Sequence, residues 1–375
     1  MDAAPPLPPP AIEQPAPRQV SYGVVSGRAA PGAARVIVSA GGRVVGARWI
    51  RAGSKRGRRF WLRVPLPMGD VNVRVTTLAH DGTGSSSVVR DVFSLPAAAQ
   101  PRFVRSREDP VLKRSISPLV RGYSGTGAYY VQSLTTGGGA AWNARARFPA
   151  ASTLKLAIAV TALAGHSGIP ARGSYVGGLF DQMITVSDDE AANLVEVWMA
   201  GSTSAGSARV NAMMRSIGLV DSIMYGGYEV RTPSAHIPVR VDEQPYWGVG
   251  KYTTAWDMTQ LWRAIWLASG NRGPLRKAQP GFTPADARYL LWLLAHVRDQ
   301  RKLDTSLRDR PGISVLHKAG WISDARHDTG LVFWRGGVFV AGVMTWRSWG
   351  VGLSSDRLAG RVASLAYKRF HALRG

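Results

Sequence analysis

Three short segments carry the residue types that acyl transfer needs. In the first, Ser152 and Lys155 stand three residues apart at the start of an apolar run in which Leu154, Ile158 and Ala162 recur at helical spacing. Residues three apart share a helix face, so the lysine amine can point at the serine hydroxyl. A serine is a poor nucleophile until a base takes its proton, and a lysine becomes that base when burial and the positive end of a helix lower its pKa. The segment therefore predicts Ser152 as nucleophile, Lys155 as base and the Ser152 N–H as an oxyanion donor, with an exposed serine–lysine pair as the alternative.

The other two segments supply a second hydroxyl and a second lysine. Ser187, in MITVSDDEAANL, can relay a proton to a leaving group, although with Glu190 three residues later it also fits an ordinary capping box. Lys318, at the end of a strand-like run, can attract a substrate carboxylate. Gly320 allows close backbone approach to a ligand, and the Trp321 N–H can serve as a second oxyanion donor. Alone, this third segment is most often a turn.

In this order the three segments resemble the Ser-x-x-Lys, Ser-Asp-Asn and Lys-Thr-Gly set of class A β-lactamases and penicillin-binding proteins. FPAASTLKL is similar to the family's stretch around its nucleophile, MITVSDDEAANLV is similar to its second motif, and Thr253-Thr254 before a helix resembles its TT segment. The resemblance runs from about residue 109 to the C terminus. It implies a transpeptidase-like fold and acylation of the serine by a β-lactam or a D-alanyl-D-alanine-like peptide. It also implies four catalytic roles: nucleophile Ser152, base Lys155, proton relay Ser187 and carboxylate anchor Lys318.

Departures from the family pattern bear on activity. Asp189 stands where the family usually has Asn, and this carboxylate would repel an acidic substrate. Ala319 replaces a hydroxyl residue, and Ser187 follows Ser152 more closely than in typical class A enzymes. The sequence has no Glu-x-x-Leu-Asn segment to carry a deacylating glutamate. Glu229, in YGGYEVRT, lies nearest the expected place and is either that base or a surface carboxylate.

The chain divides into four parts by composition. Residues 1–18 are proline-rich and predict an extended tether, and residues 98–107 predict a second linker. Between them, residues 19–97 show short β-type runs parted by turn residues, which predict a small antiparallel sandwich. The run VSGRAAPGAARVIVSAGGRVV resembles the first strands of bacterial immunoglobulin-like modules. Residues 108–375 read as strand, helical block, three strands and a final helix, which predicts an α+β fold with an antiparallel sheet covered by helices.

Composition limits the remaining possibilities. The 375 residues carry a formal charge of +23 and no cysteine, which excludes disulfides and a cysteine nucleophile. No His/Asp/Glu cluster has metal spacing, so neither metal nor cofactor is expected. No apolar run reaches the roughly eighteen residues that cross a bilayer, and no signal peptide is visible. We expect an extracytoplasmic protein that acts on a β-lactam or peptidoglycan peptide. Association with the cell wall fits this expectation.

The densest basic run lies in the first sandwich and contains Arg48, Arg51, Lys55, Arg56, Arg58, Arg59 and Arg63. It is either a docking patch for an anionic wall polymer or a solvated strand-and-loop face. The charge does not come with a recognisable nucleic-acid motif. A rival hypothesis to catalysis is therefore a weakly active or inactive wall-binding scaffold that docks through this basic module.

Overall fold

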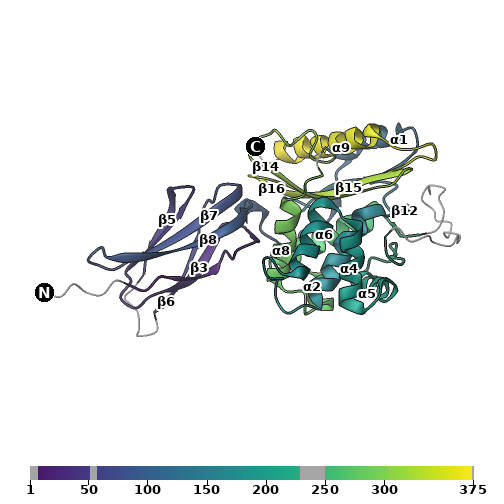
Figure 1. Ribbon diagram of the computed structural model, residues 1–375. Coiled ribbons are helices and arrows are strands. Elements are labelled where there is room, and N and C mark those ends of the chain that lie inside the picture. Colours follow the sequence, from purple (N-terminus) through teal and green to yellow (C-terminus); the bar gives the residue numbers. More distant parts are fainter. Residues whose placement is uncertain (1–6, 51–56, 229–249, 300, 374–375) are drawn as a thin grey trace. The chain divides into compact units, whose positions relative to one another are not determined.

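The computed structural model describes residues 7–50, 57–228, 250–299 and 301–373. The chain forms two compact units, Met1–Gln100 and Pro101–Gly375. Each unit has its own hydrophobic core (Figure 1).

The first unit is built from two sheets. The three-stranded sheet has the order β1 (Ala11–Gln14), β3 (Val24–Ala29), β6 (Arg58–Arg63). The five-stranded sheet has the order β2 (Gln19–Ser21), β8 (Gly84–Ser94), β7 (Gly69–Leu78), β4 (Arg35–Ala40), β5 (Arg43–Trp49), and a 3-10 turn, η1 (Ala97–Ala99), follows it. Alternate valines of β4 and β7 point into a shared core with Val25, Phe60 and Leu62 from the other sheet. The all-β prediction for this part is confirmed, and the immunoglobulin-like resemblance remains a prediction.

The N-terminal tether prediction is wrong for part of residues 1–18. β1 pairs with β3 in antiparallel register. Ahead of β1, the carbonyls of Pro8 and Pro10 accept hydrogen bonds from the hydroxyls of Ser85 (2.9 Å) and Ser87 (2.6 Å). Proline lacks an N–H but keeps its carbonyl acceptor, so proline-rich chain can lie along the edge of a sheet. The second expected linker likewise contains a short strand, β9 (Arg107–Glu108), which pairs with the sheet of the second unit.

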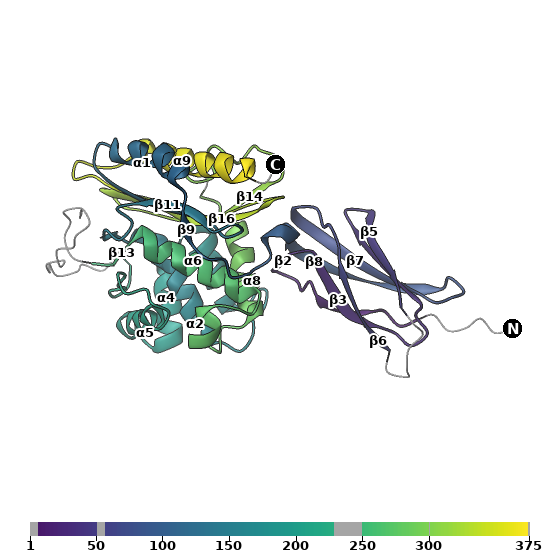
Figure 2. The same ribbon diagram turned by 180° about the vertical axis from the view of Figure 1, so that it is seen from behind.

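The second unit holds a six-stranded sheet between two helical layers (Figures 1 and 2). The strand order is β14 (Ile313–Trp321), β15 (Ala325–Trp334), β16 (Gly337–Trp346), β10 (Thr126–Ser133), β11 (Gly138–Trp142), β9. One face carries α1 (Pro110–Arg121) and α9 (Leu353–Ala372). The helices on the other side are α2 (Lys155–Ala164), α3 (Tyr175–Asp181), α4 (Asp189–Ala200), α5 (Thr203–Ser216), α6 (Ala255–Ser269), α7 (Pro274–Ala278) and α8 (Pro284–Ala295). The α+β prediction is confirmed.

Polar side chains fix where these helices begin and how they meet the sheet. Asp109 caps α1 by accepting from the Leu112 N–H, and it also accepts from Arg369 Nε at 2.9 Å, which ties α1 to α9. On the opposite face, the indole N–H of fully buried Trp262 in α6 donates to Thr329 Oγ1 of β15 at 2.9 Å. These contacts satisfy buried polar groups where helices pack on the sheet.

One buried ion pair fixes β14, the strand that carries the lysine of the third motif. His317 Nδ1 lies 2.9 Å from both carboxylate oxygens of Asp328 on β15, and Asp328 Oδ2 also accepts from the Leu303 N–H. Burial alone would lower the pKa of His317, but the charge and hydrogen bond of Asp328 outweigh it and raise that pKa above its ordinary value. The carboxylate therefore joins β14, β15 and the segment around Leu303 that precedes them at one point.

We expect Asp328→Ala to lower the free energy of unfolding by about 3–5 kcal/mol, because it leaves a buried imidazole and a buried N–H without their acceptor. Chemical denaturation measures this, with the exposed Asp309→Ala as control. Because His317 binds its proton more tightly in the folded state, the pair contributes most below pH about 6.5 and less as pH rises through the raised pKa. The deficit of Asp328→Ala should therefore shrink with rising pH. Equal stability of the two variants would contradict this assignment.

Candidate active site

Ser152 lies in a 3-10 turn, η2 (Ala151–Leu154), between a short strand and α2. The expected position in the first turn of α2 is therefore displaced by one turn toward the N terminus. The preceding strand β12 (Phe148–Pro149) pairs with β13 (Tyr252–Thr253), and the Pro149 carbonyl lies 2.7 Å from His327 Nε2. The Phe-Pro lead thus anchors the serine turn to two separate strands.

The Lys155 side chain is fully buried. Its ammonium donates to the backbone carbonyl of Ser187 and to Asp189 Oδ1, the latter at 2.5 Å. Two residues of the second motif, Ser187 and Asp189, therefore hold the Lys155 amine.

Ser187 adopts a left-handed backbone conformation, with φ of 64°, directly after a π-helical turn, η3 (Gln182–Val186). The residue that caps α4 is Asp188, whose Oδ1 accepts from the Ala191 N–H at 2.7 Å. The capping-box alternative for Ser187 and Glu190 is therefore wrong, since the helix starts one residue later. The chain reversal leaves the Ser187 hydroxyl free to accept from Lys318 Nζ at 2.6 Å.

Lys318 and Gly320 lie in β14, beside the serine turn. Lys318 is 2% exposed, and burial together with the nearby charge of Lys155 lowers its pKa to about 7. A Cβ on Gly320 would lie 2.8 Å from the Ser152 backbone nitrogen and 2.9 Å from that of Thr153. Only glycine can occupy this position without moving backbone. The structure thus gathers the residues of all three motifs.

Trp321 follows Gly320 at the end of β14, with its side chain 61% exposed. Its indole lies beside Arg326, whose guanidinium carbon is 5.8 Å from the ring centroid. Glu229 falls outside the described residues, so its role as a base stays a prediction.

A buried aromatic beside Lys155 did not emerge from the sequence. The ring centroid of Tyr228 is 4.6 Å from the amine of Lys155 and 4.6 Å from that of Lys251. The side chain of Asn193 fixes the Tyr228 backbone, donating to its carbonyl at 3.2 Å and accepting from its N–H at 2.6 Å. Asn193 belongs to the MITVSDDEAANL segment, but its tyrosine partner lies in a loop without a sequence signal.

The polar groups behind Tyr228 are also buried. Burial raises the pKa of Glu196 to about 7, although its Oε1 accepts from the Ser207 hydroxyl at 3.0 Å. Burial lowers the pKa of Lys251, whose amine donates to the Gly227 carbonyl. This concentration of perturbed groups beside Lys155 is typical of functional sites.

No group of three or more His, Asp or Glu residues in the described ranges is arranged to hold a metal ion. In the same ranges, no helix has the length and apolar character needed to span a bilayer. The residues assembled around Ser152 are hydroxyls, amines and one carboxylate, a set suited to proton transfer.

A family model described as the beta-lactamase enzyme family matches residues 111–167 and 170–370. The chain belongs to the β-lactamase enzyme family. No curated protein matches it. Among solved structures, PBP-A in an acyl-enzyme complex with penicillin G is similar at 19% identity and a TM-score of 0.55, covering 72% of this chain and 100% of that one. A mutant of the ancestral class A β-lactamase of Gram-negative bacteria matches at 21% identity and a TM-score of 0.55, covering 69% and 98%.

A β-lactamase from Streptosporangium roseum matches at 16% identity and a TM-score of 0.55, covering 70% of this chain and 99% of that one. These TM-scores show that the second unit shares the fold of the three structures. Family and fold together support a serine hydrolase of the β-lactamase and penicillin-binding superfamily, as the motifs predicted.

Lys318 should make stability depend on pH in a defined window. Its folded pKa of about 7 lies below the unfolded value of 10.5, so between these two values the unfolded chain binds more protons. The free energy of unfolding of the wild type should therefore rise with pH across this window relative to Lys318→Met. Denaturation at pH 7, 8 and 9 measures the difference, with exposed Lys368→Met as control. A wild-type curve parallel to that of Lys318→Met would show that the amine titrates normally.

Proposed function

We propose that the chain is a serine hydrolase that forms an acyl-enzyme through Ser152 with β-lactams or D-Ala-D-Ala-type cell-wall peptides. The observation that carries the proposal is that two buried amines, Lys155 and Lys318, both donate to Ser187. The strand that carries Lys318 also brings Gly320 against the backbone of Ser152. Burying a lysine amine costs free energy unless the amine is paired or loses its proton. Two such amines at one place are therefore typical of a site that transfers protons.

The chemistry follows from this placement. The Ser152 hydroxyl adds to the substrate carbonyl and gives its proton to the neutral amine of Lys155. The carbonyl oxygen becomes an oxyanion, and the backbone N–H groups of Ser152 and Trp321 are its proposed donors. As the C–N bond breaks, the Ser187 hydroxyl protonates the leaving nitrogen and recovers a proton from the Lys155 ammonium, which becomes a neutral amine again. Lys318 in its charged form attracts the substrate carboxylate.

Asp189 opposes the first of these steps. A carboxylate 2.5 Å from the Lys155 amine stabilises the ammonium, which cannot accept a proton. Asp189 lies in the first turn of α4, two residues after Ser187. Acylation therefore requires this pair to separate or its proton to leave, and we infer that the reaction is slow at neutral pH.

Deacylation meets a second obstacle. Hydrolysis of the acyl-enzyme needs a base beside the ester to activate water. On one side of Lys155 the Tyr228 ring occupies the space, and burial together with Glu196 and Asp189 raises the pKa of this phenol well above its ordinary value. A neutral phenol does not act as that base, so the proposed adduct is long-lived unless Glu229 supplies the carboxylate.

The Lys155–Asp189 pair also keeps a second candidate function open: a catalytically weak or inactive cell-wall-binding scaffold. Such a protein would retain the fold while the basic first unit docks on an anionic polymer. Both functions place the chain outside the cytoplasm, where its substrates lie.

Incubation with a penicillin-type probe should add the mass of one intact probe to the wild type, and the adduct should persist for hours after the free probe is removed. Intact-mass spectrometry measures both quantities, and Ser152→Ala is the control. An unmodified wild type, or equal labelling of Ser152→Ala, would refute acylation at this serine.

Asp189→Asn should accelerate that labelling about tenfold or more near pH 7, because an opposite charge in contact typically shifts a pKa by about 1–3 units toward the charged form. The second-order rate of probe attachment measures the effect. Glu190→Gln, exposed in the same helical turn, removes a carboxylate without touching Lys155 and should leave the rate unchanged. If Asp189→Asn labels no faster than the wild type, the carboxylate does not restrain the base.

A further inference from the structure

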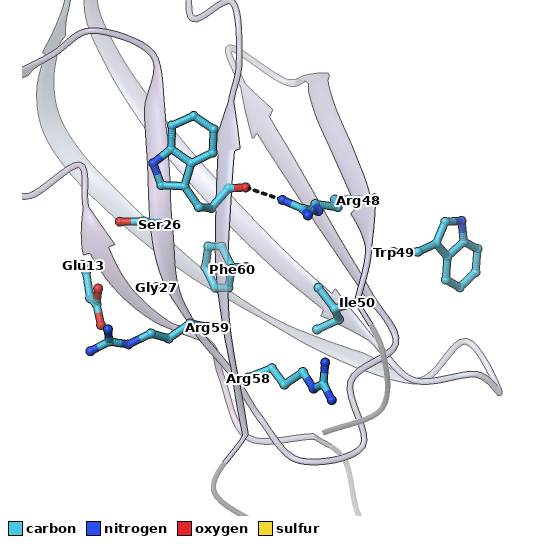
Figure 3. A pocket seen from close by; sticks show the side chains of 10 residues that line it. Glu13, Ser26, Gly27, Arg48, Trp49, Ile50, Arg58, Arg59 and Phe60 are labelled. Carbon is cyan, nitrogen blue, oxygen red and sulfur yellow. Dashed lines mark hydrogen bonds between the residues drawn. The ribbon is translucent and has the colours of Figure 1, made fainter. Parts of the chain in front are cut away.

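A groove opens in the first unit between the edge strands of its two sheets. β5 ends the five-stranded sheet and β6 ends the three-stranded sheet. The cavity between them has a volume of about 620 Å³. Its upper part is bridged by Arg48, whose Nη1 donates to the Trp61 carbonyl at 3.1 Å, drawn as the dashed line in Figure 3.

The charge of the groove is positive. Arg48, Arg58 and Arg59 line it with exposed guanidinium groups. The carboxylate in the lining, Glu13, lies 4.0 Å from Arg28 on the neighbouring strand, so an existing cation already offsets part of its charge. Guanidinium groups present paired N–H donors that match a carboxylate. A ligand that fits here carries negative charge.

The groove also has apolar surface. Half-buried Ile50 lies among the arginines, whereas Phe60 is 4% exposed and belongs to the hydrophobic core. The Trp61 indole is 50% exposed on the rim, and the guanidinium carbon of Arg63 lies 5.7 Å from its ring. Trp49 also belongs to the lining, but its ring points away from the other lining side chains in Figure 3 and stacks on His80, with the ring centroids 6.5 Å apart.

We propose that this groove binds an acidic polysaccharide, with sugar rings against Trp61 and carboxylates on Arg48, Arg58 and Arg59. A sugar ring joins an apolar face to polar edges, which suits one exposed indole beside several guanidinium groups. Single-stranded nucleic acid fits less well, because its bases stack on successive aromatic side chains and the groove offers one exposed ring. The choice of a polysaccharide rests on the proposed function, which places the chain at the cell wall.

Titration of the full chain with an oligogalacturonate of about ten sugars, at physiological salt, tests the proposal. The wild type should bind, and Arg58→Ser with Arg59→Ser should weaken binding about tenfold or more. Trp61→Ala should also weaken it severalfold although it leaves the net charge unchanged. The matched control is Arg74→Ser with Arg90→Ser, two exposed arginines of the same unit that lie outside the groove, and it should retain most of the affinity.

Equal losses in the control and groove variants would show unspecific attraction and overturn the proposal, as would undetectable binding by the wild type. Tighter binding of a single-stranded oligonucleotide of the same charge would assign the groove to nucleic acid instead. Circular-dichroism unfolding of each variant checks that the first unit is folded, because labelling of Ser152 reports on the second unit alone. Labelling that fails while the oligogalacturonate binds would defeat the proposed function and leave the groove in place.

Discussion

The active-site region depends on how two buried lysine amines are satisfied. A buried ammonium must find acceptors or lose its proton, and both amines meet their acceptors at Ser187: Lys155 at its carbonyl and Lys318 at its hydroxyl. The left-handed backbone at this serine lets one residue serve both. Asp189, in the first turn of α4, takes a further hydrogen bond from Lys155. The charge distribution of the site therefore follows from one chain reversal and the helix that comes after it.

The surrounding elements hold the turn that carries Ser152 against this pair of amines. β12 fixes the turn from one side through β13 and through the contact of Pro149 with His327, a histidine whose pKa burial lowers to about 4 and which is therefore neutral. Gly320 closes the other side, where backbone meets backbone. Rigid support of this kind holds the turn that carries Ser152 in one place.

Much of the second unit could be predicted from its sequence because its periodic segments are long. The last three strands and the final helix follow one another in the predicted order, and three motifs identified the superfamily. Predictions from local sequence patterns failed where the same short segment is compatible with two different local structures. Ser187 and Glu190 match a capping box, yet the left-handed turn moves the cap to Asp188. Prolines that suggested a free tether instead flank β1, since strand pairing at a sheet edge depends on a distant partner.

The contribution of Tyr228 could not be predicted for the same reason: its position depends on Asn193, thirty-five residues earlier in the chain. The deacylation question therefore rests on tertiary contacts rather than motifs. Membership of the family alone does not determine how fast the acyl-enzyme is hydrolysed, because the family fold accommodates Asn or Asp at position 189.

A crystal structure of the chain soaked with a penicillin-type compound would test the account most directly. We predict continuous electron density from the Ser152 oxygen to the opened ring, the ligand carboxylate within hydrogen-bonding distance of Lys318, and a broken contact between Lys155 and Asp189. A ligand joined to another side chain, or bound intact with the two lysines still closed around Ser187, would contradict it.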